Sequence, residues 1–164
     1  MTETPSRPVR VAVSRARNTY FFVGLLLAVL WFAPRRGGAR MDGAVPSDTC
    51  DVLRGIELVL LVAGVTFLIV FTRRVMWKRA VALGASAAGE DAVAEDYVRS
   101  KTMAAVVFGI PACLGLLLMQ VEHRGMDLML LLLPMLLMGL SWPTAAGLKA
   151  FAEQIDARRG GRPE

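Results

Sequence analysis

The sequence predicts an all-α integral membrane protein, folded as a bundle of four transmembrane helices. Hydrophobic residues make up 55% of the 164-residue chain, and the mean hydropathy is +0.50, whereas soluble domains are usually about 45–50% apolar. Aromatic residues contribute only 7%, so aliphatic side chains carry the excess. Charged residues, which are costly in lipid, separate four long apolar blocks that contain no charged residue except Glu57. This composition excludes a disordered chain, a disulfide-stabilised miniprotein and an ordinary soluble enzyme.

Each block is long enough to cross a bilayer, since a spanning helix needs about 17–25 mostly apolar residues. Lipid offers no hydrogen-bond partners to the backbone, so each block is expected to be a helix. A cleaved signal peptide is the alternative for the first block. Arg35 and Arg36 argue against it, because they follow where a small-residue cleavage site should lie. The predicted spans are 19–34, 55–72, 102–121 and 128–148.

The segments between the spans predict their own local structure. We expect a loose tail over residues 1–18 and an outward loop before Arg54. Between the second and third spans, residues 75–83 should extend one helix and residues 90–101 should lead into the next. These two stretches form a helical extension beside the membrane. Within the C-terminal tail, 149–164, a short polar helix is expected.

The distribution of charge predicts the orientation. Four spans place both tails and the helical extension on one side, with 14 of the 19 Lys and Arg residues. The positive-inside rule puts that side in the cytoplasm. The net charge of +5 is therefore interpreted as a topology signal and as an attraction to anionic membrane lipids, not as a nucleic-acid site. We expect a multi-pass protein of the bacterial inner membrane, with both termini cytoplasmic.

Glu57 is the most informative single residue. It is an acid at the start of the second span, three positions after Arg54, which is about 5 Å along a helix. An intramembrane acid is a functional candidate by default and could bind a cation or a proton. The alternative is an interfacial glutamate that pairs with Arg54 and reaches the headgroups. The two residues are thus either an ion site or an interfacial pair.

The third span carries a stripe of small residues. Such residues allow helix backbones to approach closely, either inside the bundle or toward a partner. Gly24 and Ala28 form a shorter version on the first span. The members of the stripe are Ala105, Gly109, Ala112, Cys113 and Gly115.

Other candidate features have simpler interpretations. Gln120, Glu122, His123, Arg124 and Asp127 are expected to form a solvated turn, because a metal site needs several converging ligands. The prolines of the last two spans predict local kinks, and the methionines of the fourth span predict apolar packing rather than a soft-metal site.

The two cysteines lie at different membrane depths. Cys50 is expected in the outward loop and Cys113 near the middle of the third span. A disulfide between them is therefore implausible. Cys50 should react with an impermeant thiol reagent added to intact cells.

One stretch resembles known sequences. Residues 97–144 are similar to the second hairpin of small four-helix bacterial membrane proteins that have no assigned activity. The matching positions are Pro111, Ala112, Gly115, Leu116 and Pro143. Those proteins often carry an acid just before the core proline, where this chain has Gly109 and Ile110. The resemblance implies a four-helix fold and brings no function with it.

The sequence contains no nucleotide-binding loop, no nucleophile elbow, no zinc motif and no serine paired with lysine or histidine at membrane depth. We therefore expect a non-catalytic protein without a cofactor or metal. The leading hypothesis is an accessory or scaffold subunit, or a bundle that associates with itself. The alternative is a small ion- or proton-coupled transport or channel component that uses Glu57.

Overall fold

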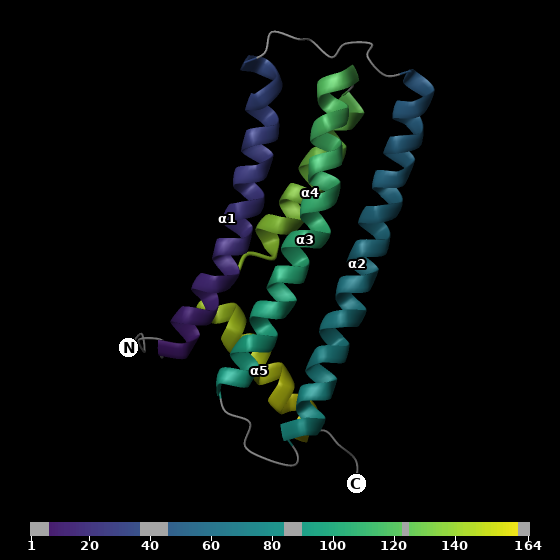
Figure 1. Cartoon of the computed structure of the whole chain (residues 1–164). Helices are drawn as coiled ribbons and strands as arrows, with labels where there is room; N and C mark the ends of the chain where they lie inside the picture. Colours follow the sequence, from purple (N-terminus) through teal and green to yellow (C-terminus); the bar gives the residue numbers. More distant parts are fainter. Residues whose placement is uncertain (1–6, 37–45, 84–89, 123–124, 161–164) are drawn as a thin grey trace.

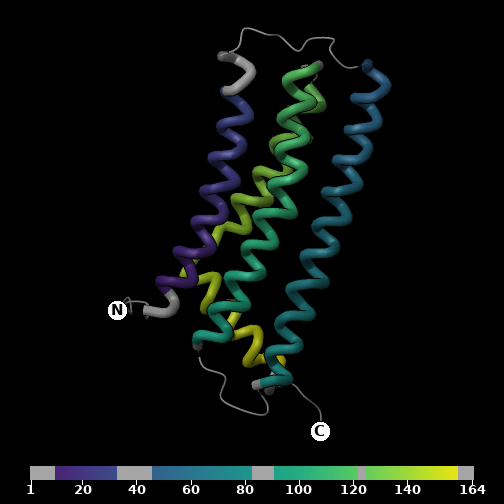
Figure 2. The backbone as a smooth tube through the Cα atoms, viewed as in Figure 1, coloured from purple at the N-terminus to yellow at the C-terminus, as the bar shows by residue number. Residues whose placement is uncertain are grey.

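Five α-helices make up the described part of the chain in a computed structural model (Figures 1 and 2). The structure describes residues 7–36, 46–83, 90–122 and 125–160. The all-α prediction is confirmed. The helices are α1 (Arg7–Arg36), α2 (Ser47–Leu83), α3 (Glu90–Glu122), α4 (Gly125–Leu140) and α5 (Ala145–Gly160).

Helix α3 is the centre of the bundle. Helices α1, α2 and α4 all pack against it, whereas the described backbones of α1 and α2 do not approach each other closely. Figure 1 shows α1 and α2 on either side of α3, with α4 alongside and α5 crossing the lower end. The buried face of α3 is rich in alanine, including Ala104, Ala105 and Ala112. Small side chains let several neighbours approach one helix closely.

The core has a separate cluster at the lower end, where α5 crosses α1, α2 and α3. Tyr97, Phe151 and Ile155 are buried there against Val13 and Met76. Two further clusters lie along the shared length of the long helices, one between α1, α3 and α4 and one between α2 and α3. Burial of aliphatic surface thus joins the long helices to one another and fixes α5 across their ends.

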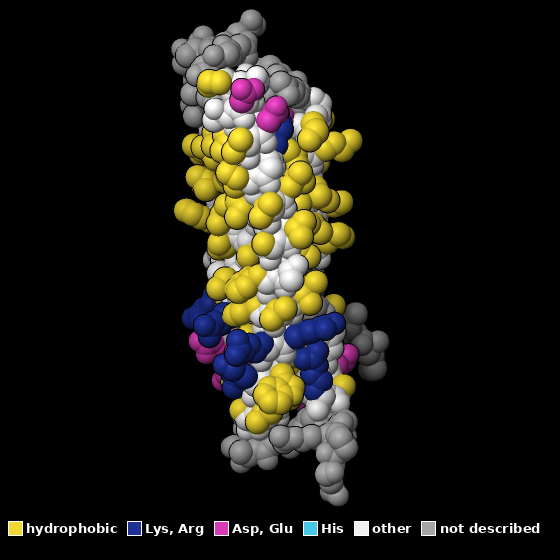
Figure 3. All heavy atoms as spheres, turned by 90° about the vertical axis from the view of Figure 1, so that its right-hand side faces the viewer, with side chains coloured by type: hydrophobic (Ala, Val, Ile, Leu, Met, Phe, Trp, Pro, Cys, Tyr) yellow, Lys and Arg dark blue, Asp and Glu magenta, His cyan; other side chains and the backbone are white. Residues whose placement is uncertain are grey.

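Helices α2 and α3 are each long and apolar enough to cross a membrane, and α4 with α5 would form a third such span if the bent pair is counted as one. Figure 3 shows a broad band of hydrophobic side chains on the face that contains α2, with Lys and Arg gathered at its lower edge. Phe67, Ile69 and Val70 of α2 are exposed. A band of this kind is typical of a surface that faces lipid.

The helices begin earlier than predicted. Helix α1 starts at Arg7, so most of the predicted loose tail is helical. Helix α2 starts at Ser47, which places Cys50 on the helix, where it is only 1% exposed. The expectation that Cys50 lies in an outward loop is wrong, because Asp48 in the first turn and the buried face of α2 extend the helix to that end. Cys50 and Cys113 form no disulfide with each other, as predicted.

The predicted helical extension is confirmed at both ends. Helix α2 continues to Leu83, and α3 begins at Glu90 and continues without a break into its apolar part. The small-residue segment 84–89 lies outside the described residues. Arg79 of α2 and Asp96 of α3 form an ion pair at 2.6 Å across the extension. The extension is therefore a packed pair of helix ends.

The prediction of one continuous helix over 128–148 is wrong. Helix α4 ends at Leu140 and α5 begins at Ala145, with a 72° bend between the helices. Pro143 has no N–H to continue the ladder, and proline disfavours helical backbone at the preceding residue, Trp142. Thr144 then starts α5 as its N-cap, because its Oγ1 accepts a hydrogen bond from the Gly147 N–H at 2.9 Å.

Candidate functional site

The end of the bundle where α2 begins contains a buried ion pair. Arg54 of α2 is 4% exposed and Asp127 of α4 is 0% exposed. The Arg54 Nε donates to Asp127 Oδ1 at 2.6 Å and Nη2 donates to Oδ2 at 3.1 Å. Arg54 also bonds Asp51, whose side chain is largely exposed. This two-point contact is the strong geometry for guanidinium and carboxylate, and it joins α2 to α4.

Glu57 lies one helix turn deeper than this pair and is only 1% exposed. Neither Glu57 Oε1 nor Oε2 has a hydrogen-bond partner among the described residues. The interpretation of Glu57 as the ion-pair partner of Arg54 is therefore wrong, because Arg54 directs its guanidinium to Asp127 and Asp51. A buried carboxyl group without a partner is costly and rare in folded proteins, so this one requires an explanation.

The Glu57 carboxyl group faces Gly115 of α3. A Cβ atom added at Gly115 would lie 2.7 Å from Glu57 Oε1 and 3.1 Å from the backbone N of Leu131 in α4. Gly115 thus leaves room for the carboxyl group where α2, α3 and α4 meet. The close approach of α3 and α4 depends on a residue without a side chain at this position.

The rest of the small-residue stripe also lies inside the bundle. Ala105 and Ala112 are 0% exposed, and a Cβ atom at Gly109 would lie 2.8 Å from Cγ1 of Val23 in α1. Cys113 packs against the cluster shared by α1, α3 and α4. The stripe brings α1 and α4 to α3, so these residues are used within the chain.

The prediction that the polar residues between 120 and 127 form a solvated turn is wrong for two of them. Asp127 is fully buried in the ion pair. Gln120 reaches α1, where its Nε2 donates to the Leu30 carbonyl oxygen at 2.8 Å. Both residues lie on helices that pack side by side, so tertiary contacts remove them from water. His123, Arg124 and the side chain of Glu122 lie outside the described residues.

A second polar cluster surrounds the break between α4 and α5. The end of one helix and the start of the next leave backbone carbonyl oxygens without partners inside a helix. Tyr20 Oη and Lys101 Nζ both donate to the Ser141 carbonyl oxygen, at 3.1 and 2.9 Å, and Arg17 Nε donates to the Pro143 carbonyl oxygen at 3.1 Å. Donors from α1 and α3 therefore satisfy the broken segment.

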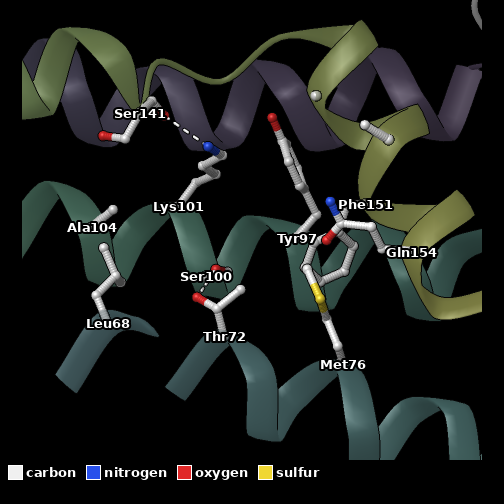
Figure 4. Close-up of a pocket in the computed structure, with 12 residues that line it drawn as sticks. Leu68, Thr72, Met76, Tyr97, Ser100, Lys101, Ala104, Ser141, Phe151 and Gln154 are labelled. Atoms are coloured by element: carbon white, nitrogen blue, oxygen red, sulfur yellow. Dashed lines mark hydrogen bonds between the residues drawn. The ribbon is translucent and has the colours of Figure 1, made fainter. Parts of the chain in front are cut away.

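Tyr97 completes this cluster from α3. Its hydroxyl donates to the Thr144 carbonyl oxygen and accepts from the Thr144 N–H, both at 3.1 Å. A cavity of about 210 Å³ lies beside it. Figure 4 shows Lys101 and Tyr97 pointing toward the break, and Thr72 of α2 and Ser100 of α3, which also line the cavity, hydrogen-bonded to each other. Because every polar group named here has a partner, this cluster serves the fold of the break.

The sequence predicts a local kink at Pro143 but not the side chains that bond to the break. The signal for the break itself was present, since the Trp-Pro pair at Trp142 and Pro143 favours a helix end. Arg17, Tyr20, Tyr97 and Lys101 sit at the ends of the first and third apolar blocks. Their partners at the break lie 40 or more positions away in the sequence, so no local pattern predicts these contacts.

Comparison with known proteins adds no further assignment. No protein-family model, curated protein or solved structure matches this chain.

Proposed function

We propose that the chain is a four-span integral membrane protein with both termini in the cytoplasm. The described helices α2 and α3 supply two spans. Helix α1 is proposed as another, because Phe21, Phe22 and Leu25 form an exposed apolar face on it and no charge interrupts residues 18–34. The fourth is α4 with the break that follows, since 16 helical residues rise about 24 Å and residues 141–144, which lie outside both helices, add the remaining depth.

Within this membrane protein, we propose that Glu57 takes up and releases a proton, which makes the chain a small, non-catalytic, proton-coupled transport or channel component. The single observation that carries this proposal is the buried Glu57 carboxyl group, whose two oxygens have no partner in the described structure. An ionised carboxylate in such a place costs several kcal/mol unless a positive charge joins it. A proton supplies that charge.

The geometry favours a proton over a larger cation. Glu57 Oε1 lies so close to Gly115 that a Cβ atom added to Gly115 would be only 2.7 Å from this oxygen. A cation needs several oxygen ligands around it and the space to hold them, whereas a proton needs neither. The Arg54–Asp127 pair lies one turn away from Glu57, toward the end of the bundle.

The test uses the full chain reconstituted in liposomes that contain a pH-sensitive dye. We expect a protein-dependent proton flux that Glu57→Gln abolishes and that Asp48→Asn leaves unchanged, because Asp48 is an exposed acid on the same helix. Equal flux from the wild-type and Glu57→Gln proteins would contradict the proposal.

A second readout does not depend on knowing the transported species. Dicyclohexylcarbodiimide is a hydrophobic reagent that attacks protonated carboxyl groups. It should modify Glu57 and spare Asp48, as measured by peptide mass spectrometry of the intact protein treated in membranes. A protein modified at Asp48 but not at Glu57 would count against a protonatable group in the apolar region.

A second candidate function is the accessory or self-associating subunit. The observation that favours it lies on α1, where Ala28 is exposed and a Cβ atom at Gly24 would meet nothing within 4 Å. This small face remains open for close approach of another helix. Native mass spectrometry after gentle extraction should then show a homo-oligomer or a co-purifying chain, and Gly24→Leu should release it. A wild-type protein that stays monomeric would remove this candidate.

A further inference from the structure

A groove between α2 and α3 lies at the lower edge of the hydrophobic band and has a cavity volume of about 330 Å³. That volume falls within the range of small-molecule sites, about 300–1,000 Å³. Its walls combine apolar residues of α2, Phe71 and Val75, with basic residues of both helices. Figure 3 shows the concentration of Lys and Arg at this edge of the band.

Three basic side chains of the groove are not used by the fold. Arg74 and Lys78 of α2 and Arg99 of α3 line it and are exposed, and none of them forms an ion pair with the described part of the chain. The fourth basic residue, Arg79, is already neutralised by Asp96 at 2.6 Å. The groove therefore carries an excess of positive charge.

The arrangement of these three residues is unfavourable unless an anion is present. Arg74 and Lys78 are four positions apart on one helix, so they lie on the same face, where like charges repel. Arg99 approaches from the facing helix and adds a third charge to the same groove. An anion placed among them would receive charge-assisted hydrogen bonds from two helices.

We infer that this groove binds the phosphate group of an anionic phospholipid, such as phosphatidylglycerol, whose acyl chains lie along the apolar surface of α2. The inference rests on the membrane placement proposed above. Arg74 follows the predicted span 55–72 by two residues, so its guanidinium would lie at the depth of lipid phosphates. Phe71 lies three residues before Arg74 and joins the groove to the apolar band, while Val75 supplies apolar wall at the depth of Arg74. Basic pockets between helices at a cytoplasmic interface are well suited to anionic headgroups.

The test is native mass spectrometry of the full-length protein in mild detergent, titrated with phosphatidylglycerol or with phosphatidylcholine. The variant is Arg74→Gln with Lys78→Gln and Arg99→Gln. The matched control removes three basic residues that are exposed on the same end of the molecule but lie outside the groove, Arg10→Gln, Arg15→Gln and Lys149→Gln. Both variants lose the same net charge, so the comparison isolates the groove.

We expect the wild-type and control proteins to retain phosphatidylglycerol in preference to phosphatidylcholine, and the groove variant to lose at least about tenfold in affinity for phosphatidylglycerol. Equal retention by the groove and control variants would overturn the inference. So would a wild-type protein without preference between the two lipids. Loss of a co-purifying protein, rather than of lipid, from the groove variant would point to an acidic partner and would also overturn it.

A separate arm distinguishes lipid from free phosphate. Inorganic phosphate at millimolar concentration should not displace the lipid, because it cannot use the apolar wall. Binding of inorganic phosphate with the same dependence on the three residues and without a lipid requirement would overturn the lipid assignment. Alkaline carbonate extraction of native membranes tests the membrane placement independently. Release of the protein by carbonate would contradict the membrane placement, whereas loss of lipid selectivity in a protein that stays in the membrane would contradict only the groove.

Discussion

Individual charged residues account for the contact between α2 and α4. Arg54 is buried on α2 and can remain there only because the Asp127 carboxylate faces it in a two-point contact. Removing one partner of a buried pair leaves the other charge without compensation, which typically costs about 3–5 kcal/mol. Asp51 contacts the same guanidinium but is largely exposed, and exposed pairs contribute only about 0–1 kcal/mol.

This difference gives a first prediction. Asp127→Asn should lower the thermal midpoint of the detergent-solubilised protein by several degrees, because Arg54 would lose its buried countercharge. Asp51→Asn is the control and should change the midpoint by little. Both midpoints are measured by intrinsic tryptophan fluorescence on heating. Equal shifts in the two variants would mean that burial does not distinguish the two acids.

Gly115 gives a second prediction at the same scale. Gly115→Ala should destabilise the protein, because the new methyl group would meet the Leu131 backbone as well as Glu57 Oε1, and backbone cannot move without shifting α4. Gly55→Ala is the control on α2, where nothing lies within 4 Å of an added Cβ atom. That change should be neutral or stabilising, since alanine is favoured over glycine in helices by about 1 kcal/mol.

The same heating measurement checks this pair of variants. A stable Gly115→Ala protein would show that α3 and α4 are not in close contact at this position. A destabilised Gly55→Ala protein would show that the outer face of α2 is covered.

At the scale of elements, the break between α4 and α5 is the feature that organises the lower end of the bundle. Pro143 ends one helix, and Thr144 caps the next. The freed carbonyl groups bond to α1 through Arg17 and Tyr20 and to α3 through Lys101 and Tyr97. One proline thus changes the direction of the chain, and hydrogen bonds from side chains of α1 and α3 fix the position of the break.

The break gives a third prediction. Tyr97→Phe keeps the ring but leaves the Thr144 N–H and carbonyl without the hydroxyl that bonds both. The hydroxyl makes two part-buried hydrogen bonds, and each hydrogen bond typically contributes about 0.5–1.5 kcal/mol. Amide hydrogen exchange at the start of α5 should therefore accelerate about tenfold or more.

Tyr20→Phe is the matched control for that change. When the Tyr20 hydroxyl is removed, Lys101 still donates to the Ser141 carbonyl oxygen. Amide exchange at the start of α5 should therefore stay closer to the wild-type rate. Equal acceleration in the two variants would contradict the particular role of Tyr97.

At the scale of the whole molecule, the hydrophobic band and the charged lower end fit the proposed orientation in a membrane. Both described ends of the chain, at α1 and α5, lie at the lower end in Figure 2. The start of α2 lies at the other end, beyond the band. The orientation therefore predicts which residues an impermeant reagent reaches in intact cells.

The fourth prediction uses this difference. In a background with Cys50→Ala, an impermeant maleimide should label Asp48→Cys in intact cells, because Asp48 is exposed at the end of α2. Lys149→Cys should react only after the membrane is permeabilised. Native Cys50 should resist labelling, since its side chain is buried. Labelling of Lys149→Cys in intact cells would reverse the orientation.

The sequence by itself determined the all-α class, the apolar blocks and the helical extension between α2 and α3. These features follow from local properties, namely hydrophobicity, block length and the positions of charged residues, which act regardless of distant parts of the chain. The same local information singled out Glu57 and the small-residue stripe. It could not say which face of each helix is buried.

Only the tertiary structure determined which side chains pair with residues of other helices. The pairing of Arg54 with Asp127 joins residues 73 positions apart, and the bonds from Tyr20 and Arg17 to the break span more than 120 positions. Such contacts depend on how α1, α2 and α4 are placed around α3, which no local pattern encodes. For that reason the sequence left Glu57 as either an ion site or a partner of its neighbour Arg54. Packing directs Arg54 to α4 and leaves the Glu57 carboxyl group buried against Gly115.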